Sequence, residues 1–415
     1  MERLPISAKS SPELVRRQNS ALVLSALRRN NRMAHTQIAD ATGLASATIS
    51  AITADLERAG VIERNESLSA VGRGRPRVLF SQRRDFGYLA LVVISSESIE
   101  YSLADYAGTL LDRFVEMRGE DGPQPFLERI SAALQRLLSR SRIGDEQLLL
   151  VSVSSKGLVD PQRPVLVWSP VFGAQPVDFS RAMQPGWRVV INNETLLVAG
   201  ALLDRARKHD AGEPVALPRG ERKLAALSLG HSIGLGIARS YASGPAEISA
   251  PNFGHMLHAA DGGLCRCGSR GCVEAYAGFY AILRSAFEVP LDTVPAKFVP
   301  IAEVDRIAMR ARQGGRQAVR AFRQAGLALG NGLSRLLSLQ GPMPVFITGL
   351  GTRYYDLLEG GVREGLAESH VVRLGGMPDL TVMADEAALV FEGHLAFSFA
   401  IVDQEIAGSA ERLQA

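Results

Sequence analysis

The stretch Cys265-Arg266-Cys267-Gly268-Ser269-Arg270-Gly271-Cys272 holds all three cysteines of this 415-residue chain, and His255 precedes it by ten residues. Three thiolates and one imidazole form a tetrahedral ligand set that suits zinc, and glycines let the loop fold back so that its sulfur atoms point inward. The expected ligands are His255, Cys265, Cys267 and Cys272. Four protein ligands leave no position for an activated water, so we interpret the site as structural zinc. The alternative is three free buried cysteines or a redox pair.

Composition excludes several classes of protein. Hydrophobic residues make up 46% and charged residues 21% of the chain, which argues against disorder, collagen-like repeats and coiled coils. No apolar run reaches the ~18 residues that span a bilayer, and the polar N-terminus argues against a secretory signal. Three clustered cysteines cannot build a secreted disulfide framework, so we expect a cytoplasmic protein. The length predicts at least two folded units.

Positive charge is concentrated near the N-terminus. Residues 1–84 carry 14 Arg and Lys against 7 Asp and Glu, a net charge of +7, whereas the rest of the chain has a net charge of −4. A basic head on a weakly acidic body indicates that the head meets a polyanion and the body does not.

The basic head has the pattern of a helix-turn-helix. Apolar residues recur at helical spacing over 18–30, and a second helix is predicted from Thr36, as its N-cap, to Thr42. Gly43 supplies a residue that tolerates a left-handed turn, and Ser46 is expected to cap a third helix. In this arrangement the N-terminal part of the second helix of the motif faces bases in the major groove. The expected base-facing residues are Ser46, Ala47, Thr48 and Ser50.

Two short β patterns at 61–64 and 78–80 predict a hairpin, or wing, after the helices. Its loop carries Arg73, Arg75 and Arg77 between Gly and Pro residues. Flexible arginines on a narrow strip suit a minor groove of negative potential. Taken alone, the loop could equally be a solvated basic turn, and helical pairs with this spacing exist that never touch DNA. The charge distribution favours a DNA-binding domain over 1–84, with Thr36 among its contacts.

From Tyr88 onward the pattern predicts an α/β body over 85–415. Predicted strands occupy 88–94, 99–104, 109–117, 148–153, 188–191, 224–229, 233–238 and 344–347, and predicted helices 125–140, 196–203 and 319–339. Glycine-bearing turns near 230 and 349 fit two similar halves around a cleft.

The body resembles the ROK family, named for repressors, open reading frames and kinases. The resemblance rests on Gly254-His255-Met256, on the cysteine loop quoted above and on Glu274. It covers nearly the whole chain, including the winged head that the family's repressors carry and its kinases lack. It implies a two-lobed, actin-like fold of the hexokinase type that closes on a sugar, with the zinc loop shaping the sugar pocket.

Three parts of the family's kinase apparatus are altered here. In place of an Asp-x-Gly-Gly-Thr phosphate loop the chain has Ser95-Ser96-Glu97-Ser98, and the charge of Glu97 would repel phosphates. Asn193 matches the catalytic Asp of the family, and an amide cannot accept the proton of a substrate hydroxyl. The second phosphate loop, at 230–236, is only partly preserved. We therefore expect no enzyme activity; the alternative is a sugar kinase fused to a DNA-binding head.

The sugar side is better preserved. Asn192, His255 and Glu274 match family positions that hydrogen-bond sugar hydroxyls. Asn193 and Asn252 stand where the family has carboxylates, and amides can still donate and accept hydrogen bonds. The resemblance thus implies a ligand site, although glucose should not be assumed. The alternative is a pocket that has drifted out of use.

Together these features predict a sugar-responsive transcriptional regulator, a repressor of genes for carbohydrate uptake or catabolism. It would be similar to repressors that respond to N-acetylglucosamine, xylose or glucose. Its expected partners are double-stranded operator DNA, a sugar effector and further copies of itself in a homodimer or tetramer, with no membrane. Effector binding would change lobe closure and the separation of two heads. Activation by the ligand and control by a partner protein both stay open.

Overall fold

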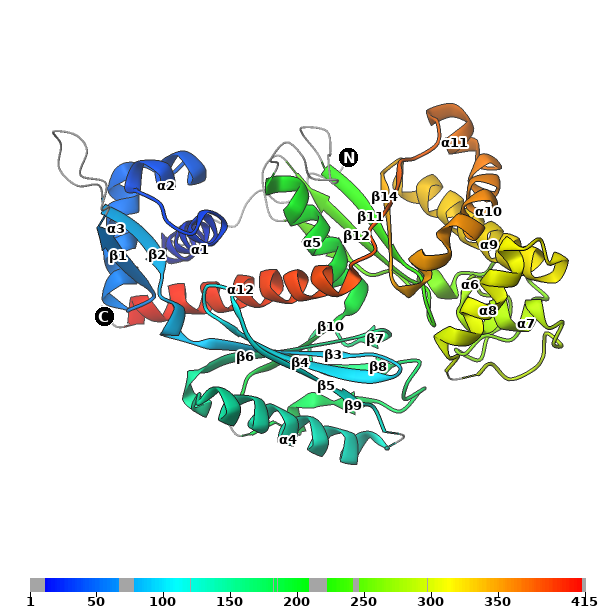
Figure 1. The fold of residues 1–415 in the computed structure, drawn as a ribbon. Helices are drawn as coiled ribbons and strands as arrows, with labels where there is room; N and C mark the ends of the chain where they lie inside the picture. The colour runs from blue at the N-terminus through cyan, green and yellow to red at the C-terminus, as the bar shows by residue number, and fades with distance from the viewer. Residues whose placement is uncertain are drawn as a thin grey trace, which may run out of the picture.

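The computed structural model describes residues 12–66, 78–119, 121–181, 183–184, 186–208, 222–241, 246–296 and 298–412. Figure 1 shows a small head at one end of a larger body, and the body has two halves, each built on a five-stranded sheet. Within the described ranges, no helix has both the length and the apolar character that a membrane crossing requires.

The head folds as three helices followed by a two-stranded antiparallel wing. Its elements are α1 (Pro12–Asn30), α2 (His35–Thr42), α3 (Ser46–Arg58), β1 (Ile62–Glu66) and β2 (Val78–Gln82). Val23 and Leu27 of α1 are buried in one cluster with Ile49 and Ile52 of α3. Gly43, between α2 and α3, has the left-handed φ of 71° that the pattern predicted. The helix-turn-helix and the paired strands of the wing are confirmed.

The two predicted N-caps are wrong. Ala34 and Ala45 have the extended backbone of N-cap residues, which places Thr36 and Ser46 inside the first helical turns. Alanine has no side chain that can cap a helix. At α2 the end is instead closed by Gln37, whose Oε1 accepts the Ala34 N–H at 2.8 Å. Because a glutamine at the third helical position can reach back in this way, the helix begins without a hydroxyl before it.

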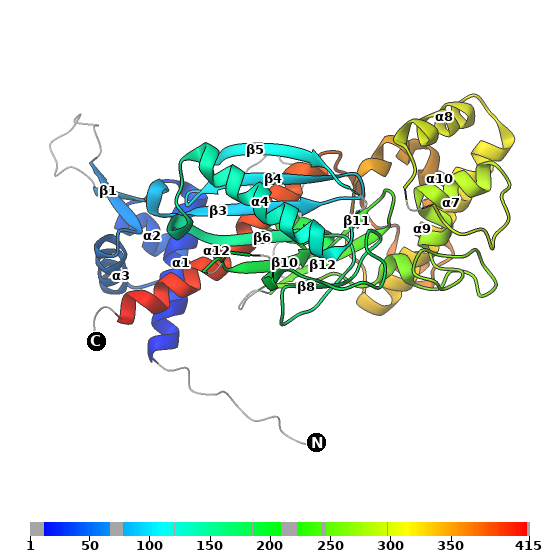
Figure 2. The same ribbon diagram turned by 90° about the horizontal axis from the view of Figure 1, so that it is seen from below.

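The first half is a sheet with helices on both faces. Its strands, in the order β10-β6-β3-β4-β5, are β3 (Tyr88–Ile94), β4 (Ser98–Asp105), β5 (Leu110–Met117), β6 (Leu148–Ser155) and β10 (Val189–Asn193). Ala90 and Val92 pack in the cluster that holds α4 (Pro123–Ser141), whereas Leu89 and Leu91 pack with residues of α12 (Glu386–Arg412). Figures 1 and 2 show these helices on opposite faces. Because both faces are covered, β3 is apolar along most of its length.

The second half repeats this plan. Its sheet, in the order β13-β12-β11-β14-β15, contains β11 (Arg222–Ser228), β12 (Gly234–Ser240), β13 (Glu247–Ser249), β14 (Val345–Thr348) and β15 (Leu380–Val382). Its helices are α6 (Glu274–Ala277), α7 (Phe279–Ala286), α8 (Ile301–Arg312), α9 (Arg316–Gln340), α10 (Tyr355–Ala367) and α11 (His370–Gly375). A further small sheet in the first half holds β7 (Leu158–Val159), β8 (Val165–Trp168) and β9 (Val177–Asp178).

In both sheets three antiparallel strands are followed by two parallel ones. The prediction of two similar halves is therefore confirmed, but the turns that suggested it were misassigned. The turns at 230 and 349 both belong to the second sheet, after β11 and β14. Their counterparts in the first half follow β3 and β6 and contain no repeated glycine, because Ser95–Ser98 and Ser155-Lys156-Gly157 stand there.

Two helices are exchanged between the halves. Helix α5 (Glu194–Lys208) leaves the first sheet and packs on the second, whereas α12 leaves the second sheet and packs on the first. The helices cross in contact at Gly393, where a Cβ atom would collide with the Leu197 carbonyl oxygen. A glycine is needed there because any larger side chain would separate the helices.

A buried histidine joins α12 to the first sheet. His394 lies between two serines of β6, with Nδ1 2.8 Å from Ser152 Oγ and Nε2 2.9 Å from Ser154 Oγ. Burial lowers the pKa of His394 from 6.5 to about 3. The ring is therefore neutral at physiological pH, and both of its nitrogens are hydrogen-bonded.

We expect His394 to make stability fall with acidification. Between pH 6.5 and 3 the unfolded chain binds a proton at His394 that the folded chain does not, so the free energy of unfolding decreases by up to about 1.4 kcal/mol per pH unit. His394→Gln should show a shallower pH dependence in urea unfolding between pH 7 and 5. The control, His370→Gln at an exposed position, should keep the wild-type slope. A wild-type slope in His394→Gln would contradict a neutral, buried ring.

Candidate functional site

The predicted DNA-facing side of the head is open to solvent. Ser46, Ala47 and Ser50 on α3 are exposed and Thr48 is half-buried, while Ile49 beside them is buried. Thr36 is exposed on α2. The sequence thus separated the inward from the outward positions of α3 correctly. The remaining predicted contacts, Arg73, Arg75 and Arg77, lie outside the described residues.

The predicted zinc ligands converge in the second half. The ligand atoms of His255, Cys265, Cys267 and Cys272 all lie within 4.8 Å of one another. The Cys267 and Cys272 sulfurs are 3.7 Å apart, too far for a disulfide. A tetrahedral zinc ion with bonds of about 2.3 Å places its sulfurs about 3.8 Å apart. These residues therefore fit a metal ion.

Two glycines shape the metal loop as the sequence predicted. Gly268 and Gly271 have φ of 89° and 72°, in the left-handed region, and a Cβ at Gly271 would collide with the Ala259 carbonyl oxygen. Burial raises the pKa of Cys265 to about 11, with Glu274 adding to the effect. A thiolate in this position therefore needs a cation beside it.

Arg266 connects the metal loop to the region between the halves. Its Nη1 donates to the His231 carbonyl oxygen at 2.9 Å, and its Nη2 donates to the Ala296 carbonyl oxygen at 2.7 Å. The guanidinium also lies over the Tyr280 ring, 4.6 Å from its centroid. The turn between β11 and β12 is thus held in place by a residue whose two neighbours are predicted metal ligands.

Among the predicted sugar-binding residues, Asn192 and Glu274 have buried polar atoms with no partner. Asn192 Nδ2 and Glu274 Oε1 make no hydrogen bond to any described residue. The other carboxylate oxygen of Glu274 accepts the Ile233 N–H at 3.1 Å, and burial raises the pKa of Glu274 to about 7. A buried polar atom without a partner is costly unless a ligand or water satisfies it. These two atoms are therefore a structural sign of a ligand site.

The other predicted sugar-binding residues differ in their surroundings. Asn193 is engaged by the chain: Nδ2 donates to the Gly157 carbonyl oxygen at 2.7 Å, and Oδ1 accepts the Thr195 N–H at 2.9 Å and the Thr195 hydroxyl at 2.7 Å. His255 packs edge-on against Trp168 of the first half, with ring centroids 5.2 Å apart. Asn252 is exposed. The structure therefore fixes the orientation of Asn193.

A cavity of about 580 Å³ lies between the halves. Its wall includes Ser95–Ser98 after β3, Lys156 after β6, and the turns at Gly230 and Gly349. The wall does not include the five predicted sugar-binding residues, although all of them are described. This position, outside the carboxyl ends of the central strands, is where α/β sheets commonly bind ligands.

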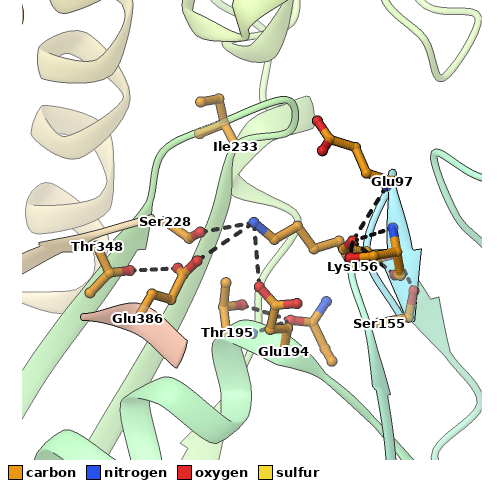
Figure 3. A network of polar contacts seen from close by, with 12 residues as sticks. Glu97, Ser155, Lys156, Glu194, Thr195, Ser228, Ile233, Thr348 and Glu386 are labelled. Carbon is orange, nitrogen blue, oxygen red and sulfur yellow. Dashed lines mark hydrogen bonds and ion pairs between the residues drawn. The ribbon is translucent and has the colours of Figure 1, made fainter. Parts of the chain in front are cut away.

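Lys156 occupies the centre of a polar network that the sequence pattern did not reveal (Figure 3). Its Nζ donates to Ser228 Oγ at 3.1 Å and lies 3.4 Å from Glu194 Oε1 and 4.0 Å from Glu386 Oε2. Burial opposes the charge of Lys156, but Glu194 and Glu386 outweigh it and the pKa is raised. Lys156 directly follows β6, and Glu194 and Glu386 are the first residues of α5 and α12. A charged residue at the end of a strand or the start of a helix was the sequence feature that could have pointed to this network.

The cavity wall is acidic. Its fixed cations are Lys156 and Arg353, and its carboxylates are Glu97, Glu100, Glu194, Asp385 and Glu386. Asp385 also accepts the Ala388 N–H at 3.0 Å, where a helix N-terminus would otherwise attract an anion. The side chain of His231 is buried in the wall, and burial lowers its pKa to about 4, so it adds no charge at neutral pH. This arrangement opposes the binding of a polyphosphate.

Comparison with known proteins gives relatives of two kinds. The chain is 22% identical over 369 residues to a xylose repressor of Bacillus subtilis, covering 88% of this chain and 86% of the repressor. It is 27% identical over 322 residues to a glucokinase of Streptomyces coelicolor, covering 71% of this chain and 96% of the glucokinase. A crystal structure described as a ROK family transcriptional regulator, homologous to the Escherichia coli Mlc protein, covers 95% of this chain and 99% of its own with a TM-score of 0.73 at 18% identity.

Two family models match the two parts of the chain. Residues 17–63 match a winged helix-turn-helix DNA-binding model, which agrees with the exposed face of α3 and the paired strands of the wing. Residues 94–382 match the ROK family model and include the second sheet, the metal loop and the strands of the first sheet other than β3, of which only Ile94 lies in the match. Since this match takes in more than half of the sequence, the chain belongs to the ROK family.

Proposed function

We propose that this protein is a sugar-responsive DNA-binding repressor of carbohydrate genes that acts in the cytoplasm. The observation that carries the proposal is the joining of a helix-turn-helix to a ROK body around one hydrophobic cluster. Val23 and Leu27 of the head share that cluster with Leu89, Leu91 and Phe399 of the body. The similarity to a xylose repressor over 88% of this chain supports the same function.

We assign DNA binding to residues 1–84 and ligand binding to residues 85–415. The gap between β2, which ends at Gln82, and β3, which begins at Tyr88, supports this boundary. The start of α3 would enter the major groove, and the arginines of the wing loop would lie along the minor groove. Two heads of a homodimer would hold a pseudo-palindromic operator. The DNA contacts would be Thr36, Ser46, Ala47, Thr48, Ser50, Arg73, Arg75 and Arg77.

The proposed sugar site lies beside the metal loop. Asn192 and Glu274 would use their unpartnered polar atoms to bind hydroxyls, and His255, Asn193 and Asn252 would complete the site. Glu274, with a pKa of about 7, can both accept and donate near neutral pH. Because a ligand changes DNA binding only through unequal affinity for two states, closure of the cleft must alter the position of the heads.

The test of this function is selection of a duplex from a random DNA pool by the full chain. We expect recovery of a duplex with related half-sites, whose affinity changes about 5- to 150-fold when the effector is added. Xylose, glucose, N-acetylglucosamine and their phosphates would be screened by anisotropy. Substituting Arg73 and Arg75 by Ala should lower the salt slope of log affinity by about 0.9 for each phosphate that the wing no longer neutralises.

The control for the arginine variant is Arg363→Ala, which lies on α10 in the second half and is paired with Glu359. It should leave both affinity and salt slope unchanged. Failure to select any duplex would refute the proposed function. An unchanged slope in the arginine variant would show that the wing does not touch DNA.

The rival function is a sugar kinase, and the similarity to a glucokinase is the observation that favours it. Three observations oppose it: Asn193 is an amide whose oxygen already accepts two hydrogen bonds, the first phosphate loop lacks glycine, and the cleft wall is acidic. We expect no ADP above background from ATP and any of the screened sugars in a coupled assay, with a glucokinase as the positive control. Sugar-dependent ADP release would establish the rival.

We propose structural zinc at His255, Cys265, Cys267 and Cys272. The ion would hold the loop, and through Arg266 the turn that contains His231. Purified protein should contain about one zinc per chain by mass spectrometry, and Cys267→Ser should lose it and unfold at lower temperature. Ser269→Ala, at an exposed position of the same loop, should keep the metal. Full thermal stability of the zinc-free Cys267→Ser protein would exclude a structural role.

A further inference from the structure

Helix α12 extends from the cleft between the halves to the head. It begins at Glu386 in the cavity wall and ends at Arg412. Its 27 residues span about 40 Å at about 1.5 Å per residue. Figures 1 and 2 both show it along one face of the first sheet, with its C-terminal end against α1. One continuous helix thus extends from the cavity wall to the head.

The cleft end of α12 is joined to both halves by Lys156. Glu386 and Glu194 are the first residues of α12 and α5, where a carboxylate favours the positive end of a helix. The ammonium group lies between these carboxylates and donates to Ser228 of the second half at 3.1 Å (Figure 3). Thr348 of the second half donates to Glu386 at 2.8 Å. We call the contacts of Lys156 with Ser228, Glu194 and Glu386 the Lys156 bridge.

The other end of α12 is joined to the head through Asp403. This buried carboxylate accepts Arg28 Nη1 at 2.6 Å, Arg28 Nη2 at 3.2 Å and the Tyr106 hydroxyl at 2.7 Å. The Arg28 guanidinium also lies over the Phe399 ring, 3.6 Å from its centroid. Arg28 belongs to the last turn of α1 and Tyr106 follows β4. One side chain of α12 therefore contacts both the head and the first half, in addition to the hydrophobic cluster that they share.

The contacts along α12 are unequal for the two halves. On the first half the helix is held by His394 between Ser152 and Ser154, and Leu89 and Leu91 pack in one cluster with Phe399. On the second half, the Lys156 bridge and Thr348 supply polar contacts at the cleft, and Leu389 and Val390 near the start of α12 pack in one cluster with Phe346. The packing of α12 on the first half and the head extends from Phe391 to Ile406, so it resists displacement more than the short contact of Leu389 and Val390 with the second half does.

We infer that the head, α12 and the first half move as one rigid body, and that the Lys156 bridge is the latch that fixes this body relative to the second half. Breaking the bridge lets the second half rotate about the α5–α12 crossing at Gly393. The head keeps its position on the first half while its distance to the second half changes. That this movement alters DNA affinity rests on the proposed function.

Distances between spin labels test the latch without DNA. Labels on a genetically encoded ketone residue, which spares the three cysteines, would replace exposed residues: Thr36 in the head, Gln135 in the first half and Arg320 in the second. In Lys156→Met the head-to-second-half distribution should broaden or shift, while the head-to-first-half distribution stays unchanged. Asp403→Asn should broaden the head-to-first-half distribution. Equal broadening of both distributions in Lys156→Met, or no change in either, would overturn the inference.

Two further variants serve as a substitute and as a control in this test. Ser228→Ala removes the hydrogen bond between the halves without leaving a buried charge unpaired, so it carries the test if Lys156→Met does not fold; it should change the same distribution in the same direction. Glu364→Gln breaks the exposed Arg323–Glu364 pair within the second half and should change neither distribution. If Ser228→Ala behaves like Glu364→Gln, the bridge is not a latch.

Duplex affinity then separates the inference from the proposed function. With the selected duplex, Lys156→Met should change affinity about 5- to 150-fold. In the Asp403→Asn background the same substitution should change it by a smaller factor, because Asp403 contributes to the coupling of the head to the first half. If Lys156→Met changes duplex affinity by the same factor in the Asp403→Asn background as in the wild type, the inference is overturned even though the protein binds DNA. Absence of any selected duplex would refute the proposed function, while the label distances would still decide the latch.

Discussion

The direct contact of α5 and α12 at Gly393 sets the geometry of the whole body. Each helix leaves one sheet and covers the other, so their crossing sets the distance between the halves. The first residues of both helices, Glu194 and Glu386, are brought to the floor of the cleft by the same crossing. The cavity and the path from cleft to head thus follow from one close approach of two backbones.

Charge distinguishes the head from the cleft. The head carries a net positive charge that suits DNA, whereas the cleft wall carries more carboxylates than cations. The half-buried ammonium of Lys156 is stabilised by two carboxylates and a hydroxyl. Removing one partner from such a group usually costs more than the pair contributes. The acidic cleft wall therefore disfavours an ATP-like ligand.

The helix-turn-helix and the central strands were predictable because their signals are local, whereas helices such as α8, α10 and α12 were not predicted. Apolar residues at helical spacing predicted α1 and α3, and apolar runs predicted the central strands of both sheets. The prediction of Thr36 as an N-cap was wrong because the Gln37 side chain, and not a hydroxyl, closes the start of α2. Both residues lie within the same few positions, so the sequence allowed either interaction. The repeat of two halves was confirmed, yet Gly230 and Gly349 did not mark it, because the first half makes the equivalent turns with serine and lysine.

Residue types within short segments were enough to predict the His255 and cysteine cluster, which the structure brings together, and the outward face of α3. The loss of a catalytic carboxylate at Asn193 stays a prediction from the resemblance to the ROK family. Only the tertiary structure shows that Lys156 contacts Glu194 and Glu386, which lie 38 and 230 positions further along the sequence. Likewise, Arg28 and Asp403 lie near opposite ends of the sequence and form one ion pair. Such contacts follow from the path of α12 across the first sheet, and the spacing of residues in a chain carries no record of that path.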